Sequence, residues 1–87
     1  MASFDATVSV RLREGVLDPQ GQAIEGALIS LGFEGVASVR QGRVFDVTLD
    51  AEDESAARDR LTAMCEALLA NTVIERYQIA LQETKER

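Results

Sequence analysis

Residues 4–12 alternate strictly between apolar and polar side chains, and this alternation restricts the fold more than any other feature of the sequence. The apolar positions are Phe4, Ala6, Val8, Val10 and Leu12, and the polar ones are Asp5, Thr7, Ser9 and Arg11. Successive side chains of a strand point to opposite faces of its sheet. The alternation therefore predicts a strand that buries one face and exposes the other.

A helix is expected after this strand. Asp18 can accept hydrogen bonds from the free backbone N–H groups of a helix start, and Pro19 suits the first helical position. Apolar residues then follow at helical spacing, at Ala23, Ile24, Ala27, Leu28 and Leu31. Gly32 stands where a left-handed cap would end the helix. We expect this helix over about residues 19–31, where Gly26 marks close approach to the sheet or to a partner.

The second half of the chain predicts a hairpin, a helix and a strand. Gln41 and Gly42 form the hairpin turn, because glycine tolerates a positive φ. The flanking strands contain Val36 and Val39 before the turn and Val44, Phe45, Val47 and Leu49 after it. A helix over about residues 53–70 carries an apolar stripe of Ala57, Leu61, Met64, Cys65, Leu68 and Leu69. Residues 72–81 form the last strand.

The element order βαββαβ predicts an α+β fold, in which a four-stranded antiparallel sheet carries both helices on one face, as in ferredoxin-like domains. With 87 residues the chain holds one domain, expected over residues 1–82 with a polar tail over 83–87. One conflict stays open. The parity of Tyr77 and Ile79 places Glu75 inward, so either the strand starts near Arg76 or the segment bends.

The composition argues against several classes of function. There is no histidine, which removes zinc sites built on histidine and Ser–His or Cys–His nucleophile pairs. The net charge of -6 would repel nucleic acid and anionic membranes. No apolar run approaches the ~20 residues of a bilayer span, and a single cysteine excludes an internal disulfide. We expect a cytoplasmic protein.

The remaining reactive groups have structural explanations. Cys65 lies on an apolar stripe, and the acidic residues 52–54 stand where a helix start favours negative charge. The glycines match no phosphate-binding loop. The arginines at positions 11, 13, 40 and 43 could grip an anion, although solvated charges explain them as well. We expect no catalytic residue, metal site or cofactor on this chain, which would act by binding other proteins.

The sheet face opposite the helices is expected to mix apolar and polar residues. Its members include Val44, Thr48, Ile74, Ala80, Thr7, Ser9, Arg11, Asp46 and Gln78. A small sheet with such a face and with unpaired edges commonly covers them by self-association. We therefore expect a homodimer or a tetramer.

Several segments of the sequence resemble one protein family. They are Val16–Gly21, Gly26–Leu28 with Leu31 and Gly32, Val39–Arg43, Met64–Glu66 and Leu68–Tyr77. On these segments the chain resembles the PurS family, the small subunits of phosphoribosylformylglycinamidine synthase. The family usually has lysine where Arg43 stands, and arginine keeps the charge with a different hydrogen-bond geometry.

The resemblance implies a non-catalytic subunit that holds a glutaminase chain, PurQ, and a synthetase chain, PurL, together in purine biosynthesis. In that complex glutamine supplies ammonia, and ATP activates the substrate amide for its conversion to the amidine. The resemblance places ATP and Mg²⁺ on the synthetase chain.

Nine residues carry more specific features than folding alone requires, and they are candidate partner contacts. They are Gln20, Gly21, Arg40, Gly42, Arg43, Asn71, Thr72, Ile74 and Glu75. A tight corner that needs the last four for folding explains them equally well. Two other functions stay open: a dimeric ferredoxin-like module that binds a small regulatory ligand, and an acylphosphatase-like enzyme that would depend on Arg13.

Overall fold

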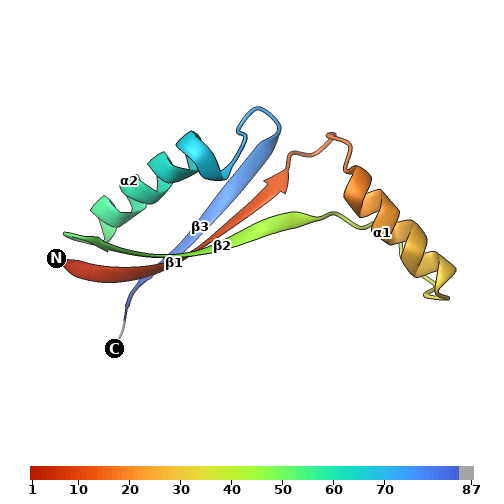
Figure 1. The fold of residues 1–87 in the computed structure, drawn as a ribbon, viewed down its shortest axis with the longest axis horizontal. Coiled ribbons are helices and arrows are strands. Elements are labelled where there is room, and N and C mark those ends of the chain that lie inside the picture. Colours follow the sequence, from red (N-terminus) through yellow and green to blue (C-terminus); the bar gives the residue numbers. More distant parts are fainter. Residues whose placement is uncertain (85–87) are drawn as a thin grey trace.

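The chain forms a small sheet with one helix packed on it and a second helix beyond its end (Figure 1). A computed structural model describes residues 1–84. The elements are β1 (Ala2–Leu12), α1 (Pro19–Ser30), β2 (Gly42–Ala51), α2 (Glu54–Met64), the π-helical turn η1 (Cys65–Leu69) and β3 (Glu75–Glu83). The strand order is β2-β1-β3, and β1 runs antiparallel to both neighbours.

The core lies between this sheet and α2. The inward side chains of β1 from Phe4 to Val10 are buried as the alternation predicts, and Val8 and Val10 are almost fully enclosed. Leu61 and Cys65 pack against them from α2 and η1. Cys65 is thus a core residue, as expected. The predicted helix over residues 53–70 is confirmed as α2 continued by η1.

The predicted fourth strand is absent from residues 1–84, in which three strands are found. Residues 36–41 run outside the sheet, and β2 begins at Gly42 with no hairpin turn before it. The Asp18 carboxylate accepts a hydrogen bond from the Gln41 N–H at 2.7 Å. The Arg40 guanidinium donates to the Val16 carbonyl at 2.9 Å. These contacts hold the segment near the start of α1 and away from the edge of β2.

The prediction that both helices cover one face was also wrong. Only α2 lies on the sheet, whereas α1 projects past the end of it (Figure 1). The apolar stripe of α1 is not buried by this sheet, and Leu31, which follows the last residue of α1, is 74% exposed. A helical stripe indicates that one face seeks burial, but it does not specify the surface that provides it.

The helix starts and stops follow the sequence signals. Asp18 caps α1 through the Gly21 N–H at 2.9 Å, Pro19 is its first residue, and Gly32 has a φ of 96°. Asp53 caps α2 in the same way through the Ala56 N–H.

β3 starts at Glu75, whose side chain is buried, so the inward position that the parity predicts holds from that residue. At the other end β3 runs through Glu83, and residues 85–87 of the predicted tail lie outside the described residues. Within residues 1–84, neither helix combines the length and the apolar character that crossing a membrane requires.

Candidate functional site

The nine candidate residues converge on one end of the sheet. Because β1 runs antiparallel to both neighbours, the starts of β2 and β3 flank the end of β1. In the register, Arg11 pairs with Gly42 and Leu12 pairs with Glu75. The start of α1 and the corner over residues 70–74 meet the sheet at the same end. We call this region, residues 13–21, 39–43 and 69–75, the junction.

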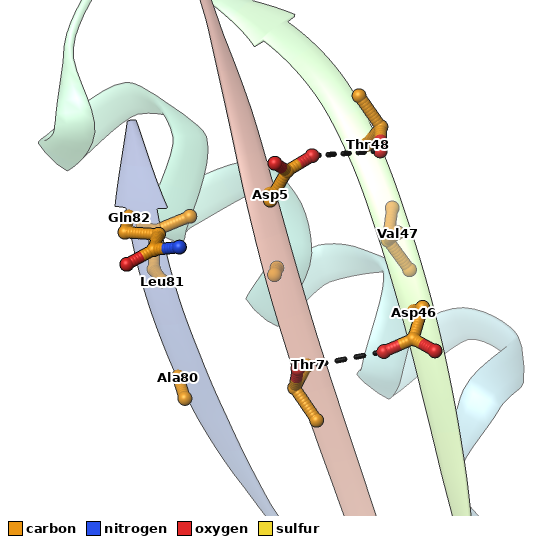
Figure 2. A pocket seen from close by; sticks show the side chains of 9 residues that line it. Asp5, Thr7, Asp46, Val47, Thr48, Ala80, Leu81 and Gln82 are labelled. Carbon is orange, nitrogen blue, oxygen red and sulfur yellow. Dashed lines mark hydrogen bonds between the residues drawn. The ribbon is translucent and has the colours of Figure 1, made fainter. Parts of the chain in front are cut away.

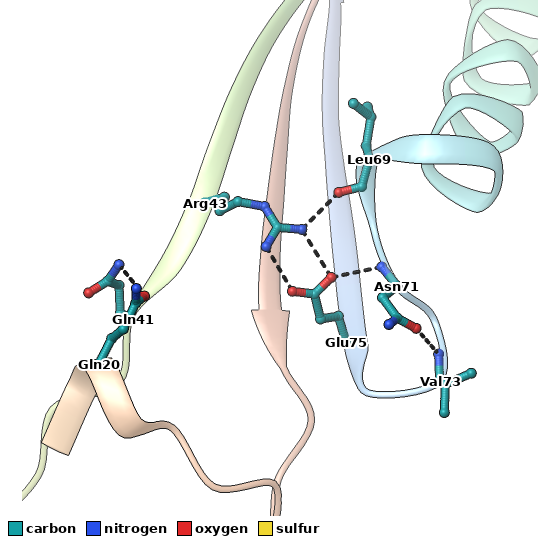
Figure 3. Close-up of polar contacts among 7 residues, drawn as sticks. All are labelled: Gln20, Gln41, Arg43, Leu69, Asn71, Val73 and Glu75. Carbon is teal, nitrogen blue, oxygen red and sulfur yellow. Dashed lines mark hydrogen bonds and ion pairs between the residues drawn. The ribbon is translucent and has the colours of Figure 1, made fainter.

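An ion pair joins β2 to β3 at the junction. Both oxygens of the Glu75 carboxylate accept hydrogen bonds from the Arg43 guanidinium, at 2.9 and 3.0 Å. Arg43 also donates to the Leu69 carbonyl at 3.0 Å, and the Asn71 N–H donates to Glu75 at 2.7 Å (Figure 3). Glu75 is buried, while half of the Arg43 side chain remains exposed. The pair therefore ties the end of η1 to both outer strands.

These contacts hold the pKa of Glu75 below its ordinary value of 4.5. The largest cause is the hydrogen bond from Arg43, followed by the Asn71 N–H, and both stabilise the carboxylate. Partial burial of Glu75 opposes them but is the weaker effect. Glu75 is thus held as an anion, which suits an ion pair and does not suit a general acid near neutral pH.

The corner over residues 70–74 is held by hydrogen bonds within its own backbone and to Arg13, the residue that follows β1. The Asn71 side chain accepts from the Val73 N–H, and the Asn71 carbonyl accepts from the Glu75 N–H. The Arg13 guanidinium donates twice to the Thr72 carbonyl, at 2.8 and 3.2 Å. Ile74 is 39% exposed at the outer side of this corner. The folding role that the sequence allowed for Asn71, Thr72 and Glu75 is therefore present in the structure.

A second group of contacts anchors α1. The Asp18 carboxylate bridges the Gly21 N–H and the Gln41 N–H, and these two hydrogen bonds lower the pKa of Asp18. A Cβ at Gly21 would overlap the Val39 carbonyl oxygen, so the two segments touch at this position. The side chains of Gln20 and Gln41 bond to each other at 2.9 Å (Figure 3). The start of α1 and the start of β2 are fastened together.

Two arginines link these groups, and the sequence assigned neither of them its actual role. Arg40 donates to the carbonyls of Val16 and Arg13. Arg13 reaches Thr72, which is 59 positions away in the sequence. No local pattern reports a contact between residues so far apart. Arg13, Arg40 and Arg43 each donate to protein carbonyls or to Glu75, so their donors serve the fold and are not directed at a common point.

The junction surrounds a hollow of about 410 Å³ that opens to solvent. Its lining includes Val10, Leu12, Asp18, Gln41, Arg43 and Glu75. Both carboxylates in it already accept hydrogen bonds from backbone or guanidinium groups. Among residues 1–84, no cluster of three or more cysteine or acidic side chains could hold a metal ion. Burial raises the pKa of the Cys65 thiol, which disfavours the thiolate.

Residues 17–41 form an arm that carries apolar side chains into solvent. Leu17 is 63% exposed, Ile29 is 55% exposed and Phe33 is 57% exposed. Ile29, Leu31 and Phe33 lie close together in sequence at the tip of α1, whereas Leu17 precedes its start. An exposed group of this kind is typical of a surface that another protein covers.

The sheet face opposite α2 is also uncovered, and we call it the open face. A shallow hollow of about 480 Å³ lies on it between the three strands (Figure 2). Thr48 donates to the Asp5 carboxylate at 2.9 Å, and Thr7 approaches Asp46 at 3.5 Å. The open face is therefore mostly polar, in contrast to the arm.

Known proteins resemble this chain over nearly its whole length. Residues 5–83 match a model of the PurS family, described as phosphoribosylformylglycinamidine synthase. A PurS subunit from Synechocystis is 48% identical, covering 86% of this chain and 75% of the relative. A PurS subunit from Mycobacterium leprae is 49% identical, covering 85% of this chain and 90% of the relative.

Solved structures agree with the sequence comparison. A crystal structure of Methanocaldococcus jannaschii PurS, described as a subunit of formylglycinamide ribonucleotide amidotransferase, has a TM-score of 0.85 at 36% identity. It covers 94% of this chain and 99% of its own. A chain of the PurLQS structure from Thermotoga maritima also has a TM-score of 0.85, at 31% identity, covering 97% of this chain and all of its own.

Proposed function

This chain belongs to the PurS family of phosphoribosylformylglycinamidine synthase subunits, and from that premise we propose that it is the subunit that joins the glutaminase and synthetase chains. The related Thermotoga structure is a PurLQS assembly, which supports partners of the PurQ and PurL types. In this proposal the chain contributes binding surfaces, and the other chains contribute the reacting groups.

The exposed arm is the observation that carries the proposal. A protein that worked alone would leave Ile29, Leu31 and Phe33 in water at the tip of α1. Burying a side chain of this size is worth about 1.5–3 kcal/mol, so several together can support an interface. We propose that the arm docks against a partner chain.

The junction positions this arm and belongs to the same proposed interface. The candidate contacts are Gln20, Gly21, Arg40, Gly42, Arg43, Asn71, Thr72, Ile74 and Glu75. Of these, Ile74 offers an exposed apolar side chain, and Gln20 offers an exposed amide. The others contribute by fixing the backbone that carries them.

The remaining parts of the proposal concern the complex. ATP and Mg²⁺ act on the synthetase chain, where ATP activates the substrate amide and ammonia from glutamine displaces the activated oxygen. We place the complex in the cytoplasm, treat residues 1–82 as one domain, and expect the chain to associate with itself as a dimer or a tetramer.

A matched pair of substitutions tests the arm. Ala27→Asp and Ala63→Asp introduce the same charge at exposed alanines of α1 and α2. We expect Ala27→Asp to weaken assembly with the glutaminase and synthetase chains in sedimentation velocity, and Ala63→Asp to leave assembly unchanged. Equal assembly by both variants and the unsubstituted chain would contradict the proposed role of the arm.

A further inference from the structure

Beyond its base, the arm carries charges of one sign only. Residues 19–39 contain Glu25 and Glu34 and no lysine or arginine. Arg40 follows directly, but its guanidinium donates to backbone carbonyls at the base of the arm. The one ion pair in the described part of the chain lies at the junction, so neither glutamate of the arm is neutralised there. The arm is therefore electronegative.

The end of α1 adds to this negative potential. The C-terminus of a helix carries partial negative charge, which a nearby cation stabilises. The last turn of α1 contains no basic residue. The N–H groups of Gly32 and Phe33 bond back to carbonyls of α1, so Glu34, the next residue, stays close to this helix end. The tip of the arm thus gathers negative charge without a cation to balance it.

The rest of the arm is suited to burial. Glu25 is the only charged residue of α1, and a helix with so little charge is typical of a protein interior. Yet α1 has no extensive contact with any strand or other helix of the described chain. Ile29, Leu31 and Phe33 are each more than half exposed at its tip. The arm therefore combines an apolar surface with a small number of negative charges.

We propose that the arm docks into an apolar groove on a partner chain and that lysine or arginine side chains border this groove. A projecting helix with exposed apolar residues is an element that fits a groove. The apolar floor would bury Ile29, Leu31 and Phe33, and the basic border would meet the two glutamates and the end of α1. The inference rests on the proposed role of the arm, and it specifies the chemistry of the surface that receives it.

The charge of the arm favours this occupant over the alternatives. An anionic membrane or a nucleic acid would be repelled. Two arms packed on each other would oppose carboxylates with carboxylates, because a two-fold interface uses the same patch on both copies. A surface with a basic border instead attracts both glutamates, and this attraction speeds the encounter of the two chains.

Removal of the two charges at nearly constant side-chain size tests the inference. The variant Glu25→Gln/Glu34→Gln is compared with the unsubstituted full chain in its association with the glutaminase chain and the synthetase chain, each tested separately by surface plasmon resonance. Toward the chain that carries the groove, we expect the association rate constant to fall by about threefold or more at low salt. Its dependence on NaCl should also become weaker, because fewer charges remain to be screened.

Glu52→Gln/Asp59→Asn is the matched control, since it removes the same net charge at exposed positions away from the arm. We expect this control to associate like the unsubstituted chain. Circular dichroism checks that each variant folds.

Equal rates and equal salt dependence for Glu25→Gln/Glu34→Gln and the unsubstituted chain would overturn the inference. Faster association of this variant would also overturn it, because it would indicate an acidic partner surface. So would a change in self-association alone, measured by sedimentation equilibrium, since it would place a second copy on the arm. Ala27→Asp keeps the proposed function separate: if that variant loses assembly while the charge variant associates normally, docking of the arm stands and only the basic border is rejected.

Discussion

At the scale of single residues, Arg43 and Glu75 resolve the parity conflict in the last strand. The sequence placed Glu75 inward, where a lone carboxylate would be costly, and offered a later strand start or a bend as ways out. The structure starts the strand at Glu75, next to the predicted Arg76, and supplies a second inward charge, Arg43, from β2. The alternation was readable from the sequence, whereas the pairing was not, because the two residues lie 32 positions apart.

We predict that Arg43→Ala lowers the free energy of unfolding by about 1–2 kcal/mol, because it leaves the buried Glu75 carboxylate with the Asn71 N–H alone. The half-exposed position of Arg43 keeps the loss below that of a fully buried pair. Urea denaturation measures the change. Arg43→Lys retains the charge without the two-pronged geometry and should lose less. Equal stability of Arg43→Ala and the original chain would refute a structural role for the pair.

The lowered pKa of Glu75 predicts a specific pH dependence. Between its folded value and the ordinary 4.5, the unfolded chain binds more protons at this position, so stability falls as the pH drops through that interval. Glu75→Gln removes the titrating carboxyl and with it this fall in stability at low pH. We expect the original chain to be the more stable at pH 7 and its advantage to shrink as the pH falls below about 4.5. A constant difference from pH 7 to pH 3 in urea titrations would disagree.

At the scale of elements, the limits of α1 were predictable but its packing was not. Asp18, Pro19 and Gly32 mark the ends of α1 by local chemistry, and the structure uses all three. The apolar stripe does not specify the surface that it meets, so the expectation that α1 packs on the sheet failed. The predicted hairpin is missing because of a contact that no local pattern reports. The Asp18 carboxylate accepts a hydrogen bond from the Gln41 N–H, 23 positions away in the sequence.

The two glycines of α1 give an opposed pair of predictions. A Cβ at Gly21 would overlap the Val39 carbonyl oxygen, whereas a Cβ at Gly26 meets no atom within 4 Å. Gly21→Ala should therefore destabilise the chain, and Gly26→Ala should stabilise it by about 0.5–1 kcal/mol. Thermal unfolding of the two variants at one concentration measures both. A stabilising Gly21→Ala would contradict the tight contact at the junction.

Gly26 also bears on assembly. The sequence expected close approach to the sheet or to a partner at this position, and the sheet does not approach it. If a partner packs there, Gly26→Ala should raise the stability of the isolated chain while weakening assembly with the glutaminase and synthetase chains. Unchanged assembly would mean that the partner packs on another side of α1.

At the scale of the whole molecule, the elongated shape of the described chain fits a subunit that connects others. Its extents are 51 × 31 × 15 Å, and the arm and the open face are separate surfaces. The sequence predicted the fold class and the absence of a histidine-based site from local patterns and composition. It could not predict the detached arm, since an apolar helical stripe does not specify which surface buries it.

The most direct test of the joining role is turnover in the reconstituted complex. The glutaminase and synthetase chains are mixed, this chain is titrated in, and product is measured with glutamine or with an ammonium salt as the nitrogen source. We predict that glutamine-dependent turnover rises with this chain and saturates at a fixed ratio, while ammonia-dependent turnover by the synthetase chain continues without it. Full glutamine-dependent turnover in the absence of this chain would contradict the proposal.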